Sequence, residues 1–170
     1  GKTPFPTYPN GFPDEITDEF IKRCSLPGIL GNCTASGTEI IERLGEEHEK
    51  TKKPIVYTSA DSVFQIAANE EIYSVDELMS MCRTAREILC GRHGVGRVIA
   101  RPYIMENGKR VRTANRRDFP IVPDKENLLM YLKESGINVY AVGKIEDIVA
   151  GSGIYEAVHT KDNMDGMDKT

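Results

Sequence analysis

Apolar residues recur at the spacing of amphipathic helices in four segments of the chain. The pattern predicts helices at residues 14–23, 36–50, 74–90 and 124–135. Two of these segments begin with a capping box, Ser36-Gly-Thr-Glu39 and Ser74-Val-Asp-Glu77, in which serine and glutamate side chains bond backbone N–H groups of the first turn. Asp124 is the expected N-cap of the last helix, and Gly136 is its expected C-terminal stop.

Short apolar runs alternate with these helices and predict strands at residues 55–58, 97–104 and 137–142, with a short strand or turn at 30–33. Asn107-Gly108 predicts a tight turn that leads into a second hairpin arm at 111–113. We interpret residues 62–69 and 144–149 as helices, 115–118 as a polar loop, and 162–170 as lacking a helix or strand. The alternation favours an α/β fold with a small mixed sheet flanked by helices.

Length and composition narrow the class of protein. The 170 residues predict one domain over residues 1–170, and a net charge of −4 argues against nucleic-acid binding. No apolar run approaches the length of a membrane span, and the first residues lack the order of a signal peptide. The four cysteines form no paired motif, which favours reduced thiols in a cytoplasm. The three histidines are isolated and are expected at the surface or in loops, and both chain ends look excised from a longer protein.

Polar and basic groups stand at the ends of the predicted strands. The strand 55–58 runs into Ser59 and Asp61, where the expected helix would contribute free N–H groups and a positive dipole end. Arg97 and Arg101 alternate on the next strand, and Lys144 follows the last one. Because arginine binds phosphate bidentately and lysine binds it as a point charge, this pattern indicates a site for an anionic small molecule.

Simpler interpretations of the same residues stay open. The Ser59–Asp61 turn is also typical of an N-cap with no ligand. Arg97 and Arg101 also suit the exposed face of a half-buried strand, and the charges at 115–118 suit solvent.

Several motifs, in order along nearly the whole chain, resemble those of bacterial phosphopentomutases. They are Tyr8-Pro-Asn-Gly-Phe-Pro13, Ala35-Ser-Gly-Thr-Glu39, Ile55-Val-Tyr-Thr-Ser-Ala-Asp-Ser-Val63, Gln65-Ile-Ala-Ala68, Gly96-Arg-Val-Ile-Ala-Arg-Pro102, Arg112-Thr, Asn115-Arg, Gly143-Lys-Ile and Asn163-Met-Asp-Gly-Met167. The resemblance is to the cap domain that this family inserts, through short linkers, into a core of the alkaline phosphatase superfamily.

The resemblance implies an isomerase of nucleoside salvage that interconverts ribose 1-phosphate and ribose 5-phosphate, and the deoxyribose analogues. Such an enzyme uses two manganese ions and a phosphorylated threonine in its core, with a sugar bisphosphate activator. The core motifs that carry the threonine and the metals do not occur in this sequence. Because phosphoryl transfer depends on metals to neutralise charge and align the reacting oxygens, we expect this chain alone to be inactive.

The resemblance also implies roles for nine side chains. Those expected to hold the distal phosphate are Arg97, Arg112 and Lys144. Those expected to reach the ribose hydroxyls are Ser59 and Asp61, and those expected to shape the pocket are Val63 and Ile99. Two further residues, suited equally to salt bridges between cap and core, are Arg101 and Arg116. The expected partners are the enzyme's own core and ribose 5-phosphate or deoxyribose 5-phosphate.

Two other classes of function remain open from the sequence. One is a stand-alone module that binds a sugar phosphate without a core domain. The other is an interaction domain that binds no ligand.

Overall fold

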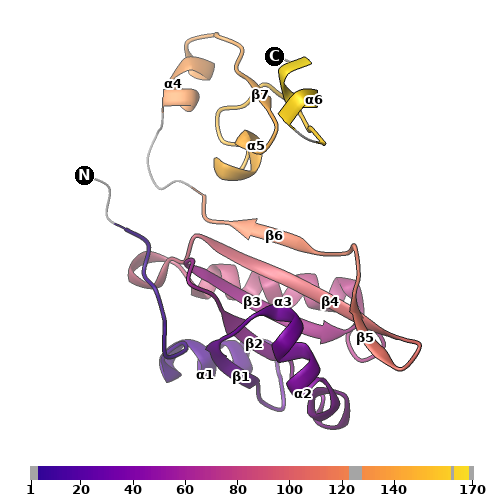
Figure 1. Ribbon diagram of the computed structural model, residues 1–170. Coiled ribbons are helices and arrows are strands. Elements are labelled where there is room, and N and C mark those ends of the chain that lie inside the picture. The colour runs from indigo at the N-terminus through magenta and orange to yellow at the C-terminus, as the bar shows by residue number, and fades with distance from the viewer. Residues whose placement is uncertain (1–3, 123–127, 162, 169–170) are drawn as a thin grey trace. The chain divides into compact units, whose positions relative to one another are not determined.

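The chain folds into two units, Gly1–Phe119 and Pro120–Thr170. The computed structural model describes residues 4–122, 128–161 and 163–168 (Figure 1). Each unit has its own sheet. That residues 1–170 form a single domain stays a prediction.

A six-stranded sheet forms the centre of the larger unit. Its strands are β1 (Leu30–Thr34), β2 (Ile55–Thr58), β3 (Val63–Asn69), β4 (Arg97–Glu106), β5 (Lys109–Arg112) and β6 (Arg117–Pro120). The order is β1-β2-β3-β4-β5, with β6 paired to β4. Parallel pairs (β1–β2, β3–β4) occur beside antiparallel pairs (β2–β3, β4–β5). The predicted α/β fold with a mixed sheet is therefore confirmed.

Helices cover both faces of this sheet. The long helices of the larger unit are α1 (Asp14–Arg23), α2 (Gly37–Thr51) and α3 (Val75–Ile88), with a short 3-10 turn η1 (Gly91–His93). Side chains of α1 and α3 share one apolar cluster with Phe64 and Ile66 of β3, while those of α2 share another with Tyr57 and Ala67. Residues of β3 thus alternate between the faces, as the period of a strand requires.

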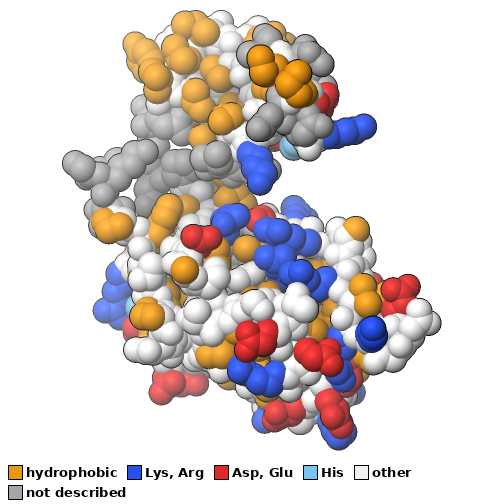
Figure 2. All heavy atoms as spheres, viewed as in Figure 1, with side chains coloured by type: hydrophobic (Ala, Val, Ile, Leu, Met, Phe, Trp, Pro, Cys, Tyr) orange, Lys and Arg blue, Asp and Glu red, His pale blue; other side chains and the backbone are white. Residues whose placement is uncertain are grey.

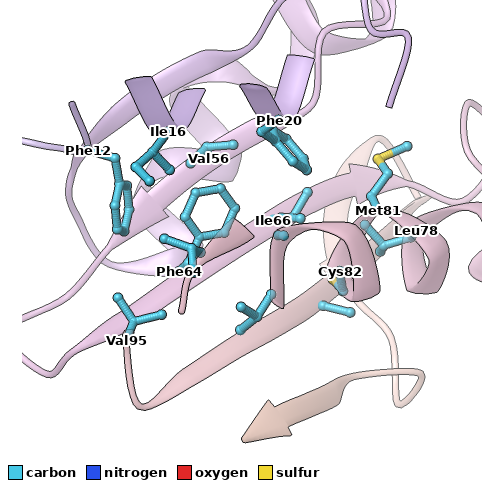
Figure 3. Packing of buried hydrophobic residues seen from close by; sticks show 14 of the residues in the cluster. Phe12, Ile16, Phe20, Val56, Phe64, Ile66, Leu78, Met81, Cys82 and Val95 are labelled. Carbon is cyan, nitrogen blue, oxygen red and sulfur yellow. The ribbon is translucent and has the colours of Figure 1, made fainter. Parts of the chain in front are cut away.

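The larger cluster is built around aromatic rings. The Phe64 ring centroid lies 4.7 Å from that of Phe12 and 5.5 Å from that of Phe20 (Figure 3). Leu78 and Cys82 of α3 are buried against the same cluster. The capping box predicted for α3 is also confirmed, because Ser74 and Glu77 exchange both of its hydrogen bonds.

The helix predicted over residues 62–69 is wrong, because these residues contain strand β3. All seven side chains of β3 are buried, and the strand lies between β2 and β4. A segment without a polar face cannot lie on the surface as an amphipathic helix, and its Val, Phe and Ile side chains suit a central strand. The segment after Ser59 and Asp61 therefore does not supply the helix dipole that was expected there.

Three smaller expectations also need correction. Residues 115–118 are not wholly a loop, because β6 begins at Arg117 and pairs with β4. His48 is not a surface residue, since it is fully buried on α2. The chain end is not free of regular structure, since α6 (Asn163–Asp168) lies there.

The smaller unit has a sheet of two parallel strands. Its elements are α4 (Leu128–Glu134), β7 (Tyr140–Val142), α5 (Ile145–Ile148), β8 (Glu156–Val158) and α6. Gly136, at φ +77°, ends α4 as predicted, and its N–H bonds the carbonyl of Lys133. The predicted cap Asp124 lies outside the described residues.

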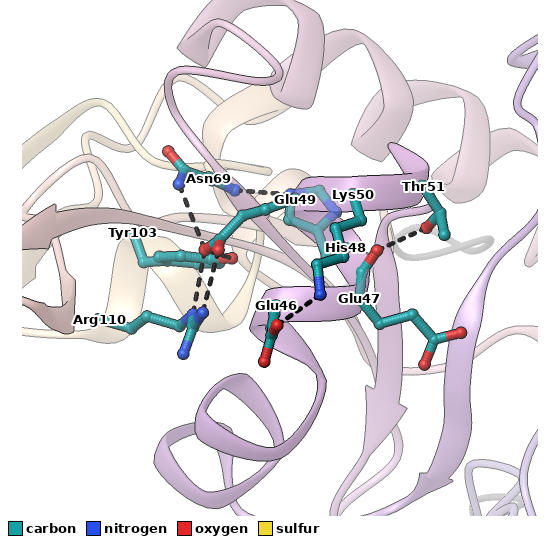
Figure 4. Close-up of polar contacts among 9 residues, drawn as sticks. All are labelled: Glu46, Glu47, His48, Glu49, Lys50, Thr51, Asn69, Tyr103 and Arg110. Atoms are coloured by element: carbon teal, nitrogen blue, oxygen red, sulfur yellow. Dashed lines mark hydrogen bonds and ion pairs between the residues drawn. The ribbon is translucent and has the colours of Figure 1, made fainter.

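A polar network joins the C-terminal half of α2 to the sheet (Figure 4). The Glu49 carboxylate accepts hydrogen bonds from Arg110 Nε at 3.0 Å, Arg110 Nη2 at 2.9 Å and the Tyr103 hydroxyl at 3.0 Å. His48 Nδ1 lies 2.7 Å from the Lys53 carbonyl oxygen, and its Nε2 accepts the backbone N–H of Asn69 at 2.9 Å. These bonds fix α2 against β3, β4 and β5.

Candidate anion-binding site

Basic side chains gather on one surface of the larger unit (Figure 2). On β4, the side chains that share a face with Tyr103 are those of Arg97, Ile99 and Arg101, because residues of a strand alternate between faces. Tyr103 packs in the cluster under α2. Arg97 and Arg101 therefore lie on the α2 face of the sheet, where the helix leaves part of β4 uncovered.

The β4–β5 hairpin adds a third arginine to this face. Asn107 and Gly108 both have positive φ, 50° and 73°, as the two central residues of a tight hairpin turn require. This turn pairs Tyr103 with Arg112. Residues paired directly across a sheet point to the same side, so Arg112 lies on the α2 face.

The loop after β5 places a fourth arginine, Arg116. Glu70 holds this loop, because its Oε1 accepts hydrogen bonds from Thr113 Oγ1 at 2.6 Å and Asn115 Nδ2 at 2.9 Å. A hollow of about 200 Å³ lies here, and its lining residues are Arg101, Pro102, Arg112, Thr113 and Arg116. Three of the four arginines thus surround one cavity in the larger unit.

One carboxylate partly neutralises this basic surface. Asp118 accepts from Arg97 Nη1 at 3.3 Å, and from Arg116 Nε at 2.9 Å and Nη2 at 3.1 Å. Arg101 instead donates Nε–H to the Gln65 side chain at 3.0 Å. Burial lowers the pKa of Arg101, and the charges of Arg116 and Arg112 act in the same direction. Such crowding of like charges favours an anionic ligand that neutralises them.

The predicted ribose-facing residues lie at one end of β3 and β4. Ser59 is half-buried and Asp61 is exposed in the loop between β2 and β3. Val63, 3% exposed, pairs with Arg97 at the start of both parallel strands, and Ile99 is 2% exposed. The larger unit therefore brings the predicted loop, the buried pair and the arginines to one sheet.

Lys144 belongs to the smaller unit. It is exposed between β7 and α5, after Gly143, whose N–H bonds the Val158 carbonyl. Its place beside the arginines stays a prediction.

Three residues of this surface were not predicted from the sequence. Asp118 was expected to be a solvent-exposed charge, although its position two residues after Arg116 allows an ion pair between the two side chains. Tyr57 belongs to the predicted strand 55–58 and Gly37 to the predicted capping box, and the sequence pattern gave neither of them a role in a site. Both lie where α2 begins, because a Cβ atom on Gly37 would come within 2.6 Å of the Tyr57 hydroxyl. The β2–β3–β4 register puts Tyr57 on the same face as Arg101, and the sequence carried no local signal for that register.

The two manganese ions implied by the resemblance do not fit this chain as far as it is described. Within residues 4–122, 128–161 and 163–168, no group of three or more His, Cys, Asp or Glu side chains could hold a metal ion. Within the same ranges, no helix has the length and apolar character needed to cross a membrane.

Comparison with known proteins relates nearly the whole chain to one enzyme family, although no family model matches it. A phosphopentomutase of Caldanaerobacter subterraneus subsp. tengcongensis is 63% identical over 167 residues, which are 98% of this chain and 42% of that protein. The phosphopentomutase of Clostridium novyi is 60% identical over 98% of this chain and 42% of its own length. That of Acetivibrio thermocellus is 59% identical over 98% and 43%. The chain spans about two fifths of the length of the curated relatives it matches. The chain is therefore a homologue of one portion of phosphopentomutase.

Proposed function

We propose that the larger unit is the part of a phosphopentomutase that grips the sugar phosphate and closes over a metal-bearing core. The observation that carries this proposal is the surface made by Arg97, Arg101, Arg112 and Arg116 on one face of the sheet. The homology to phosphopentomutases supports the choice of a pentose phosphate as the ligand.

Each guanidinium of this surface suits a phosphate group. Arginine presents a planar set of donors that matches two phosphate oxygens, and it stays charged at any physiological pH. We assign the distal phosphate of ribose 5-phosphate or deoxyribose 5-phosphate to Arg97 and Arg112. Asp118 pairs with Arg97 and Arg116, so its carboxylate competes with a phosphate group for these two guanidiniums. Ser59 and Asp61 are assigned to the sugar hydroxyls, and Val63 and Ile99 to the pocket wall.

The proposed role is binding and exclusion of water, and not the chemical step. A cap that closes over the reacting phosphoryl group prevents water from turning transfer into hydrolysis. The metal-binding core is assigned to the rest of the enzyme, so the isolated chain should not interconvert ribose 1-phosphate and ribose 5-phosphate.

The smaller unit supports the assignment of the remaining enzyme as partner. Its large exposed apolar side chains include Leu128, Tyr131, Ile137, Tyr140 and Tyr155, each more than half exposed. Parallel strands are normally covered on both faces. We therefore propose that this unit packs against a part of the enzyme that lies outside the chain.

Steady-state kinetics of a complete phosphopentomutase that carries this segment tests the proposal. Arg112→Ala should lower kcat/KM for ribose 5-phosphate by about a hundredfold, the loss of a charge-assisted bidentate contact. The matched control is Arg117→Ala, because this arginine is also exposed on β6 but lies over the Phe119 ring. Equal kinetics for both variants, or turnover by the isolated chain, would refute the proposal.

A further inference from the structure

The hydroxyl of Tyr57 is buried without a hydrogen-bond partner. The residue is 1% exposed on strand β2, and among the residues that the structure describes its hydroxyl is the buried side-chain polar atom with no partner. Buried hydroxyls normally have a partner, because desolvation without one destabilises the fold. An unpaired group of this kind at the edge of a basic surface points to a ligand.

The Tyr57 hydroxyl points at the N-terminus of α2. An ideal Cβ on Gly37, the first residue of this 15-residue helix, would lie 2.6 Å from Tyr57 Oη and 3.4 Å from Arg112 Nη1. The two atoms are therefore no more than 6.0 Å apart, the sum of these distances. Glycine is favoured at this position because a Cβ atom would press on the Tyr57 hydroxyl.

The first turn of α2 has backbone donors that the helix itself does not satisfy. The first N–H groups of a helix have no partner within the helix. The Ser36 side chain accepts the N–H of Glu39 at 3.2 Å, which leaves those of Gly37 and Thr38 for another acceptor. The positive end of the helix dipole adds to the attraction for an anion.

The charge around the hydroxyl has one sign. Burial raises the pKa of Tyr57, and the charges of Arg101, Arg112 and Arg116 lower it. The phenol thus stays protonated at neutral pH and can donate. Asp118 binds Arg97 and Arg116, whereas Arg112 makes no ion pair among the described residues.

We propose that the Tyr57 hydroxyl, the first-turn N–H groups of α2 at Gly37 and Thr38, and the Arg112 guanidinium form one oxyanion pocket that holds a phosphoryl oxygen of the sugar phosphate. The pocket rests on the proposed function, since that function supplies the ligand. Arg112 is exposed to solvent, whereas Tyr57 is 1% exposed. Tyr57 is thereby assigned a contact with substrate.

Amide chemical shifts of the 170-residue chain test this pocket with two probes, inorganic phosphate and ribose 5-phosphate. Both probes should shift the Gly37 and Thr38 amides. Tyr57→Phe should weaken their binding about tenfold, because it removes one hydrogen bond to a charged group. The matched control is Tyr73→Phe, since the Tyr73 hydroxyl donates to the Lys52 carbonyl at 2.6 Å at the other end of α2. The control should bind both probes within twofold of the parent chain.

The outcomes separate this inference from the proposed function. Equal affinities of Tyr57→Phe and the parent chain would overturn the inference. If ribose 5-phosphate shifts Ser59 and Arg97 but not Gly37, the inference fails and the proposed function stands. If phosphate shifts Gly37 in a Tyr57-dependent way while ribose 5-phosphate moves neither Ser59 nor Arg97, the anion pocket stands, but the proposed function and the sugar phosphate as its ligand fail. If neither phosphate nor ribose 5-phosphate shifts any of these amides, both the inference and the proposed function are overturned.

Discussion

Replacing Glu49 with glutamine should destabilise the larger unit far more than the same change at Glu46, although both carboxylates lie on α2. Glu49 accepts two hydrogen bonds from Arg110 and one from Tyr103, at 2.9 to 3.0 Å. The Glu49 and Arg110 side chains are 24% and 15% exposed, whereas Glu46 and its partner Lys50 are each 71% exposed. The first pair is therefore largely shielded from water and the second is not.

The expected magnitude follows from this difference in exposure. Exposed ion pairs contribute about 0.2–1 kcal/mol, and breaking a fully buried pair costs about 3–5 kcal/mol. The Glu49–Arg110 pair lies between these limits, so Glu49→Gln should cost about 2–3 kcal/mol. That loss corresponds to a fall in Tm of about 5–10 °C for a protein of this size. Glu46→Gln should leave the free energy of unfolding nearly unchanged, because this ion pair is exposed to solvent.

Urea unfolding at pH 7 of the two variants measures these values directly. A double-mutant cycle with Arg110→Gln should give a coupling free energy above about 1 kcal/mol for Glu49. Equal free energies of unfolding for the two glutamine variants would refute the reasoning, because the Glu49 network would then not fix α2 to the sheet.

Three other expectations follow from the same contacts. Burial lowers the pKa of His48, while the Lys53 carbonyl and the Glu49 charge act in the opposite direction. Because the pKa of His48 is lower in the folded chain than its value of about 6.5 in the unfolded chain, the folded state should be most stable above that pH. As the pH falls below it, the free energy of unfolding should decrease by up to about 1.4 kcal/mol per pH unit. Urea unfolding between pH 7.5 and 5.5 checks this, and a flat profile would contradict it. Gly37→Ala should lower the free energy of unfolding by about 1–2 kcal/mol despite the helix propensity of alanine, because the new Cβ atom would clash with the buried Tyr57 hydroxyl. A rise in Tm would contradict this prediction and would show that the Tyr57 side chain can move away at little cost. Asp118→Asn should tighten phosphate binding about threefold to tenfold at low salt, because it releases Arg97 from its ion pair. This gain should vanish in 0.5 M NaCl, where salt screens the charges. Weaker binding would contradict the prediction and would mean that Asp118 positions the arginines.

Local patterns of the sequence were sufficient to predict the helices of the larger unit. Ser36 and Ser74 mark the starts of α2 and α3 because their hydroxyls bond the first turn, which depends on neighbours in sequence alone. The β4–β5 hairpin could likewise be predicted, since Asn107 and Gly108 accept positive φ with little strain.

Strand β3 could not be predicted in this way. A continuous apolar run such as residues 63–69 fits a buried helix or a buried strand, and the pairing with β2 and β4 decides between them. The two-faced arrangement of the sheet follows from that pairing. The division of the sheet residues between its two faces could therefore not be predicted once residues 62–69 were assigned to a helix.

The arginines of the site were predicted from the sequence, but their relations to other groups were not. Arg97 and Arg112 lie 15 positions apart in the sequence and come to one face only through the β3–β4 and β4–β5 registers. The unpaired Tyr57 hydroxyl depends on the position of α2 over the sheet. Such contacts between distant segments require the folded chain.

Titration of the 170-residue chain with ribose 5-phosphate tests the central claim most directly. The claim is that the arginine surface of the larger unit binds the phosphate. We predict saturable shifts of the amides of Ser59, Arg97 and Arg112 at millimolar ligand, and their loss in Arg112→Ala but not in Arg117→Ala. Shifts that are the same in all three chains, or no shifts at these residues, would contradict the claim.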